Sequence, residues 1–139
     1  MNAIERSVEI QIKVPFHDVD SAGIVWHGHY AKYFEVARCE LLDSFGYSYL
    51  AMVASGYTWP VIDMHLRYVR PALFGQTISV RATVKEWEHR LRIEYLIRDA
   101  TTGERMTKGD TVQVAVDLSN MEMQLASPPV LLERLGVSK

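Results

Sequence analysis

The sequence is poor in cysteine, has no long apolar run and has no excess of charge of either sign. Cys39 is its only cysteine, so an internal disulfide is excluded and a thiolate metal site would need other ligand types or another chain. Because Cys39 falls in a helical pattern, we expect it to be a small buried residue. The apolar stretches are a few residues long, far short of the roughly 20 that span a bilayer, so no membrane span is expected.

The charge balance excludes a further class of partner. The formal net charge is -2, and Lys and Arg form no run. Because binding to a phosphate backbone needs a basic surface, we expect no nucleic-acid partner. Residues 1–6 carry charges of both signs where a signal peptide would need an apolar core. The expected localisation is therefore cytoplasmic.

Length and composition predict one globular domain. The chain has 139 residues, of which 48% are apolar and 23% are charged. These values are close to the average of globular proteins, and a chain of this length buries one ordinary core. No break in composition marks a boundary, so we expect a single domain over residues 1–139.

Apolar periodicity predicts a strand followed by one long helix. Residues 8–14 alternate between apolar and polar, which is the period of a strand with one buried face. Pro15 ends this strand because it has no N–H to donate, and a loop follows to Gly28. From about His29 to Phe45 apolar residues recur at spacings of three and four, which predicts an amphipathic helix that stops at Gly46.

The rest of the chain reads mainly as strands that can pair as an antiparallel meander. The predicted strands cover residues 57–69, 77–87, 91–100 and 106–118, with a short edge strand at 121–125. Short helical pieces are expected at 49–55 and 130–135. The joints at 88–90 and 101–104 have hairpin length. One long helix against one antiparallel sheet of about five or six strands is the α+β class.

Polar and titratable residues gather in the loop before the long helix: His17, Asp18, Asp20, Ser21, His27 and His29. The N-terminus of a helix offers unpaired N–H groups and the positive end of the helix dipole, which polarise a carbonyl or bind an anion. A carboxylate beside such donors can attack a carbonyl or activate water, while the donors stabilise the oxyanion. The sequence has no G-x-S-x-G motif, so the serine elbow of α/β-hydrolases is excluded.

Several segments resemble the signatures of a known family. Residues 16–30 (FHDVDSAGIVWHGHY), residues 33–38 (YFEVAR), residues 68–76 (YVRPALFGQ) and Lys85-Glu86-Trp87 resemble the 4-hydroxybenzoyl-CoA thioesterase family of hot-dog enzymes. The resemblance covers most of the chain and is least informative from Leu118 onward.

The resemblance implies a fold, an assembly and an activity. The fold is a hot-dog, in which a curved antiparallel sheet wraps a long central helix. Two subunits join their sheets, active sites lie at the subunit interface, and dimers pair into a homotetramer. The implied reaction is hydrolysis of a short-chain or aromatic acyl-CoA to the free acid and CoA. It needs no metal and no cofactor other than the CoA of the substrate, and an acyl-carrier protein stays open as an alternative carrier.

The same resemblance implies roles for individual residues. Asp20 would be the nucleophile or general base. The backbone N–H of His27 would hold the thioester carbonyl, while the His27 side chain would orient substrate or water. Arg70, His89 and Arg90 are the candidates for the CoA phosphates. The remaining candidates for substrate binding are Trp26, Gly28, Tyr30 and Trp59, with aromatic side chains, including Tyr57 and Tyr68, walling an acyl pocket or packing in the core.

Other interpretations stay open. Asp20 alone could cap a turn, and Asp18 is expected to be a turn or capping residue. The loop histidines and aspartates suit a divalent metal, but no H-E-x-x-H spacing is present and we expect no metal. A non-catalytic acyl-CoA or acyl-carrier binding module and a hot-dog dehydratase or hydratase are the alternative functions. Glu35 and Arg38, three apart on the helix, are expected to pair on the surface.

Overall fold

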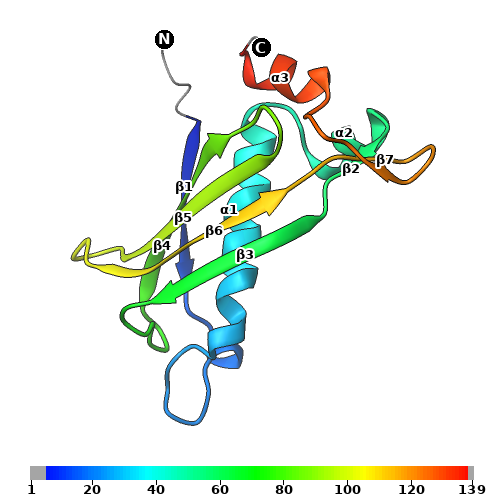
Figure 1. The fold of residues 1–139 in the computed structure, drawn as a ribbon. Helices are drawn as coiled ribbons and strands as arrows, with labels where there is room; N and C mark the ends of the chain where they lie inside the picture. The colour runs from blue at the N-terminus through cyan, green and yellow to red at the C-terminus, as the bar shows by residue number, and fades with distance from the viewer. Residues whose placement is uncertain (1–5, 138–139) are drawn as a thin grey trace.

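A five-stranded antiparallel sheet with one long helix against it organises the chain (Figure 1). The structure is a computed structural model, and it describes residues 6–137. The strand order is β1 (Ser7–Lys13), β4 (Thr77–Glu86), β5 (Leu91–Asp99), β6 (Arg105–Gln113) and β3 (Val61–Tyr68), with every neighbouring pair antiparallel. The helix α1 spans Tyr30–Ser44. This architecture confirms the predicted α+β class and the long helix that follows the first strand.

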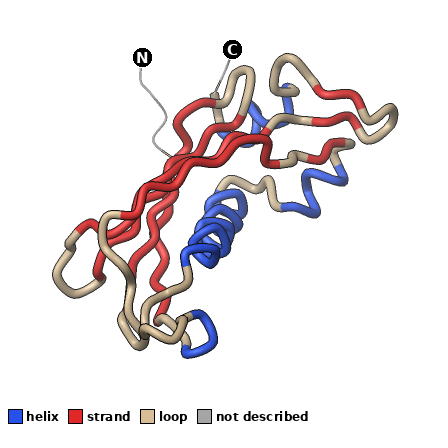
Figure 2. The backbone as a smooth tube through the Cα atoms, turned by 60° about the horizontal axis from the view of Figure 1, so that its bottom comes forward, coloured by secondary structure: helices blue, strands red, loops and turns tan. Residues whose placement is uncertain are grey.

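The core lies between α1 and the inner face of the sheet. Phe34 of α1 and Tyr95 of β5 stack with their ring centroids 4.3 Å apart and their planes 4° apart. Gly109 of β6 makes room for this pair: a Cβ there would lie 2.8 Å from the Phe34 ring. The same Cβ would also clash with the backbone carbonyl of His65, so residue 109 has to be glycine for the helix to pack this closely. In Figure 2 the α1 coil lies under one face of the long strands.

The predicted strand at 57–69 is wrong as a single element. It divides into β2 (Tyr57–Thr58) and β3, because Pro60 cannot donate to a ladder. The Trp59 carbonyl at this break accepts a hydrogen bond of 2.8 Å from the Gln113 side-chain amide.

The predicted strand at 106–118 also divides, and β6 ends opposite the start of β3, where Val61 pairs with Gln113. β6 ends at Gln113, and the chain resumes as β7 (Val116–Asp117), which pairs with both β2 and β8 (Glu122–Met123). The result is a second, three-stranded sheet. The predicted short helices are confirmed as α2 (Tyr49–Ala54) and α3 (Pro129–Leu135).

Two side-chain predictions on α1 have opposite outcomes. Cys39 is exposed, so its predicted burial is wrong. The core-facing side of the helix carries Ala37 and Leu41, and residue 39, two positions from each, points away because successive residues are about 100° apart. Glu35 and Arg38 do pair, at 3.8 Å.

The predicted single domain over residues 1–139 stays a prediction.

The helices of the described residues are too short or too polar to cross a membrane.

Candidate active site

Asp20 lies in a tight hairpin between β1 and α1. The hairpin is closed by a bridge between Val19 and Val25, and the Asp20 N–H donates to the Ile24 carbonyl at 2.9 Å. One carboxylate oxygen of Asp20 accepts from the Ala22 N–H at 2.8 Å. Asp20 therefore has the turn-capping contact that its residue type alone suggested. Asp20 is also exposed, and its second carboxylate oxygen has no hydrogen-bond partner among residues 6–137.

The segment that connects β3 to β4 holds this hairpin in place. The Val25 N–H donates to the Ala72 carbonyl at 2.9 Å, and the Phe74 N–H donates to the Gly23 carbonyl at 3.1 Å. The Tyr30 hydroxyl accepts from the Ala72 N–H at 3.1 Å. Two stretches of the recognised signature, far apart in sequence, are thus joined at the start of α1. Tyr30 is buried, so its contribution is to this framework.

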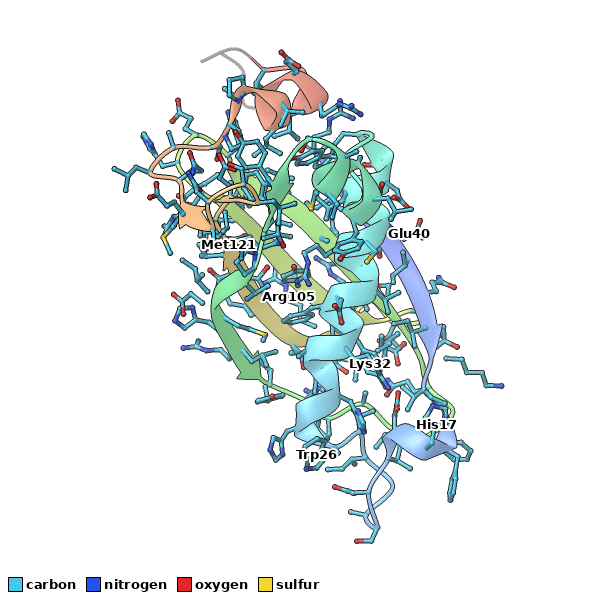
Figure 3. The ribbon with its side chains drawn as sticks, turned by 90° about the vertical axis from the view of Figure 1, so that its right-hand side faces the viewer. His17, Trp26, Lys32, Glu40, Arg105 and Met121 are labelled. Atoms are coloured by element: carbon cyan, nitrogen blue, oxygen red, sulfur yellow. The ribbon has the colours of Figure 1, made fainter. Side chains whose placement is uncertain are left out.

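Asp18 lies in the 3₁₀ turn Phe16–Asp18, as expected of a turn residue, but its side chain caps no turn. Its side chain is only 2% exposed and accepts two short hydrogen bonds, from Lys32 Nζ at 2.6 Å and from the Tyr33 hydroxyl at 2.6 Å. Both donors lie on the first turns of α1, and Figure 3 shows Lys32 on this part of the helix, above the loop that carries His17 and Trp26. Asp18 therefore connects the loop before α1 to the helix.

The contacts of Asp18 with Lys32 and Tyr33 favour the charged form of its carboxylate. Burial raises the pKa of Asp18, but the hydrogen bonds from Lys32 and Tyr33 and the positive charge of Lys32 outweigh it, and the pKa lies below its usual value. Burial and the hydrogen bond to Asp18 together raise the pKa of Tyr33 well above its usual value. The phenol therefore stays a donor.

The backbone at the start of the helix offers hydrogen-bond donors. No acceptor for the N–H groups of His27 and Gly28 occurs among residues 6–137. The Tyr68 hydroxyl donates to the His27 carbonyl at 2.9 Å. Because the peptide bond is planar and trans, that carbonyl and the Gly28 N–H point in opposite directions. Tyr68 therefore fixes the direction in which the Gly28 N–H is aimed.

Aromatic rings surround these donors. Trp26 lies 4.9 Å from the His27 ring and 5.4 Å from the His29 ring, centroid to centroid, and it is half exposed. Gly28 lies under the Trp26 ring, since a Cβ there would clash with it. Trp26 and Tyr68 are both half exposed and are therefore not core residues, a question that the sequence left open.

Three predicted site residues lie at the other end of the molecule. Trp59 is buried and donates to the Tyr47 hydroxyl at 3.1 Å, just beyond the end of α1. His89 and Arg90 lie in the β4–β5 turn near α3, and Arg90 pairs with Glu86 at 2.9 Å. A helix of 15 residues is about 22 Å long. Within one chain these residues are therefore too far from Asp20 to share its site.

Arg70, unlike Trp59, His89 and Arg90, lies at the same end of the molecule as Asp20. Arg70 follows β3 near the hairpin of Asp20 and pairs with Glu104 at 3.1 Å.

The described part of the chain has no cluster of three or more His, Cys, Asp or Glu side chains that could hold a metal ion. Lys32 and Tyr33 had not been identified, because nothing in the sequence signals that residues 14 and 15 positions beyond Asp18 meet its carboxylate.

Comparison with known proteins identifies the family of the chain. The model of the thioesterase-like superfamily matches residues 14–135. The chain belongs to that family. A Synechocystis protein named an esterase is 35% identical over 132 residues, which are 94% of this chain and 80% of that protein.

Further relatives support the same family and fold. The 4-hydroxybenzoyl-CoA thioesterase of Pseudomonas sp. is 25% identical over 114 residues, which are 80% of this chain and 77% of the relative. The structure of a DHNA-CoA thioesterase from Staphylococcus aureus superposes with a TM-score of 0.77 at 26% identity, over 84% of this chain and 78% of that one. The chain is thus a hot-dog thioester hydrolase, and the suspected family is confirmed.

Proposed function

We propose that this enzyme hydrolyses acyl-coenzyme A, of a short-chain or aromatic acyl group, to the free acid and CoA, with Asp20 as the residue that activates water or attacks the thioester. The observation that carries the proposal is the exposed Asp20, held in a hairpin before α1, in the same loop as the unpaired backbone donors of His27 and Gly28. No metal and no cofactor beyond the CoA of the substrate enters the proposal.

The reaction can be followed atom by atom in its general-base form. Asp20 accepts a proton from water while the water oxygen attacks the thioester carbon. The carbonyl oxygen becomes an oxyanion and accepts hydrogen bonds from the N–H groups of His27 and Gly28. The C–S bond then breaks, and the thiolate of CoA leaves and takes up the proton from Asp20. In the nucleophilic form Asp20 itself attacks the thioester carbon, the C–S bond breaks, and the CoA thiolate leaves. Water then hydrolyses the resulting anhydride, which frees the acid and restores the Asp20 carboxylate, and a proton of that water passes to the thiolate.

The assembly that we propose explains the residues that lie far from Asp20. Strand β3 is at the edge of the sheet, and its apolar residues Val61, Ile62, Met64 and Tyr68 are exposed. Such an edge pairs readily with another chain. If β3 pairs antiparallel with β3 of a second copy, the end near Val61 meets the partner's end near Tyr68. The region of Trp59, His89 and Arg90 would then lie near the hairpin of Asp20 in the other subunit.

Thiol release tests the chemistry. Purified wild type, Asp20→Asn and a matched control, Asp43→Asn, on the exposed part of α1, are assayed with benzoyl-CoA and with short-chain and long-chain acyl-CoA. We expect release by wild type and the control, and a loss of at least about 100-fold for Asp20→Asn. Unchanged release by a folded Asp20→Asn would overturn the mechanism. Tight binding of acyl-CoA without release would favour the binding-module function, and formation or loss of an enoyl thioester would favour a hydratase.

The edge strand is tested separately. Ile62→Lys places a charge in the exposed edge, and Leu125→Lys places the same charge at an exposed apolar residue outside the sheet. Ile62→Lys should give a monomer by light scattering and lose thiol release, whereas Leu125→Lys should do neither. An active monomer would contradict a shared site. The pairing of dimers into a tetramer and the cytoplasmic location stay predictions.

A further inference from the structure

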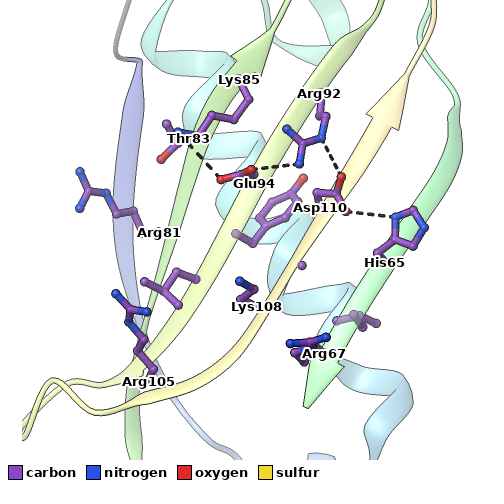
Figure 4. A pocket seen from close by; sticks show the side chains of 14 residues that line it. His65, Arg67, Arg81, Thr83, Lys85, Arg92, Glu94, Arg105, Lys108 and Asp110 are labelled. Atoms are coloured by element: carbon purple, nitrogen blue, oxygen red, sulfur yellow. Dashed lines mark hydrogen bonds and ion pairs between the residues drawn. The ribbon is translucent and has the colours of Figure 1, made fainter. Parts of the chain in front are cut away.

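The face of the sheet away from α1 carries a hollow with a strong excess of positive charge. The hollow has a volume of about 760 Å³ and is lined by six Lys and Arg side chains against two carboxylates, Glu94 and Asp110 (Figure 4). The chain as a whole has a net charge of -2. Basic residues are therefore concentrated on this face against the overall charge of the protein.

One half of the hollow is neutralised internally. Arg92 bridges Asp110 at 2.8 Å and Glu94 at 2.9 Å. Lys85 lies 3.9 Å from Glu94, and His65 lies 3.2 Å from Asp110. Both carboxylates of the hollow are used in these contacts.

The other half, which we call the basic half, consists of Arg67, Arg81, Arg105 and Lys108. Arg67 of β3 and Lys108 of β6 are direct partners in the strand register, and Arg98 and Arg105 are partners on β5 and β6. None of the cations of the basic half has an ion-pair partner among residues 6–137. Directly opposed like charges destabilise a sheet, so this arrangement costs stability unless an anionic partner covers it.

The geometry favours a protein as that partner. A second copy of this chain carries the same hollow of six cations against two carboxylates, so two of these faces packed together repel each other. A nucleic acid or an anionic membrane would bring phosphates against Glu94 and Asp110 as well. The basic half extends over four neighbouring strands, about 14 Å across, and an α-helix with its side chains is about 10–12 Å wide. An acidic helix therefore fits.

The position of the basic half relates it to the thioester site. Arg67 directly precedes Tyr68, whose hydroxyl binds the His27 carbonyl. Successive residues of a strand point to opposite faces, so Arg67 faces the hollow while Tyr68 faces the site, about 3.8 Å apart along the backbone. We propose that the basic half docks an acyl-carrier protein, a small acidic helical protein that would present its acyl group to Asp20 on a phosphopantetheine arm. This inference deepens the proposed thioesterase function and rests on it.

A matched pair of variants tests the docking surface. Lys108→Glu reverses a charge in the basic half, and Lys85→Glu makes the same change in the neutralised half of the same face. Each is assayed with one acyl group presented either on CoA or on acyl-carrier protein. For Lys108→Glu we expect kcat/KM to fall by about tenfold on the carrier substrate, because charge steers this encounter, and to stay within about twofold on acyl-CoA. Lys85→Glu should leave the preference unchanged.

The outcomes separate this inference from the function on which it rests. Hydrolysis of acyl-CoA by wild type without hydrolysis of the carrier thioester would overturn the docking surface and leave the thioesterase intact. Equal losses on both substrates, or a change in oligomeric state of Lys108→Glu by light scattering, would also overturn it. If neither substrate is hydrolysed, the thioesterase proposal fails. Salt-dependent binding of labelled carrier protein, measured by fluorescence anisotropy and weakened only by Lys108→Glu, would then still support the surface, and its absence would overturn it.

Discussion

The Tyr68 hydroxyl donates a hydrogen bond of 2.9 Å to the backbone carbonyl of His27 and thereby links the end of β3 to the start of α1. The peptide group that accepts this bond also carries the Gly28 N–H, one of the two proposed oxyanion donors. A residue of the edge strand therefore fixes the orientation of a proposed oxyanion donor through the peptide group that carries it.

Removing this hydroxyl should lower the rate of the chemical step. For Tyr68→Phe we expect kcat to fall by about fivefold, since one positioning hydrogen bond is worth about 1 kcal/mol, with KM little changed because the ring remains. Steady-state thiol release measures both constants. Tyr57→Phe, on β2 of the small sheet, is the control, and an unchanged kcat for Tyr68→Phe would show that the peptide needs no such support.

Asp18→Asn should destabilise the protein by about 2 kcal/mol, because a buried charge-assisted contact with Lys32 is lost. The pKa of Asp18 is lowered in the folded state. Its contribution is therefore fully present above the unfolded pKa of about 4 and is lost as the pH falls through the folded value. Urea unfolding from pH 7 down to pH 3 should show the stabilities of wild type and variant converging in acid.

The corresponding control is Asp43→Asn, on an exposed part of the same helix. Its stability should differ little from that of wild type at any pH in this series. A constant difference between wild type and Asp18→Asn down to pH 3 would contradict the ionised contact.

Gly28→Ala should move the Trp26 ring and leave the fold intact. The new Cβ would clash with the ring, and the half-exposed ring can rotate away at little cost. We expect a change in tryptophan fluorescence, a stability within about 0.5 kcal/mol of wild type and a higher KM for aromatic substrates. In a Trp26→Phe background the same substitution should leave the fluorescence unchanged, and a remaining change would assign the effect to another tryptophan.

Gln113→Leu should destabilise the break between the two sheets. The substitution removes the donor to the buried Trp59 carbonyl, and leaving such a group unsatisfied costs about 1–3 kcal/mol. Chemical denaturation measures the loss. Gln124→Leu, at an amide that contacts only the nearby Glu122 carbonyl in an exposed loop, is the matched control.

The sequence predicted the parts of the fold that depend on local periodicity. The first strand, α1 and both hairpins follow from apolar spacing and short joints. The breaks at Pro60 and after Gln113 were not predicted, because continuous apolar alternation does not show where a strand leaves one sheet for another. Cys39 was misplaced for a related reason: a helical pattern shows that a face is buried, and assigning a residue to that face needs its exact angular position.

The site was predictable only where the family signature reaches. Asp20, His27 and Gly28 belong to the loop between β1 and α1 that carries the signature, and their roles stay predictions, whereas the buried contact of Asp18 depends on a donor 14 residues away. Trp59, His89 and Arg90 lie at the opposite end of α1. One chain does not bring them to Asp20, and their predicted roles depend on the proposed partner subunit.

The shared break in the two neighbouring strands has a dynamic consequence. The strands β2, β7 and β8 each contain two residues, and Trp59, which follows β2, accepts a hydrogen bond from Gln113 of the main sheet through its carbonyl. Regions with few buried contacts open at lower free energy than the core. The amide hydrogens of the small sheet should therefore exchange with solvent faster than those of β4 and β5, as a separate cooperative unit.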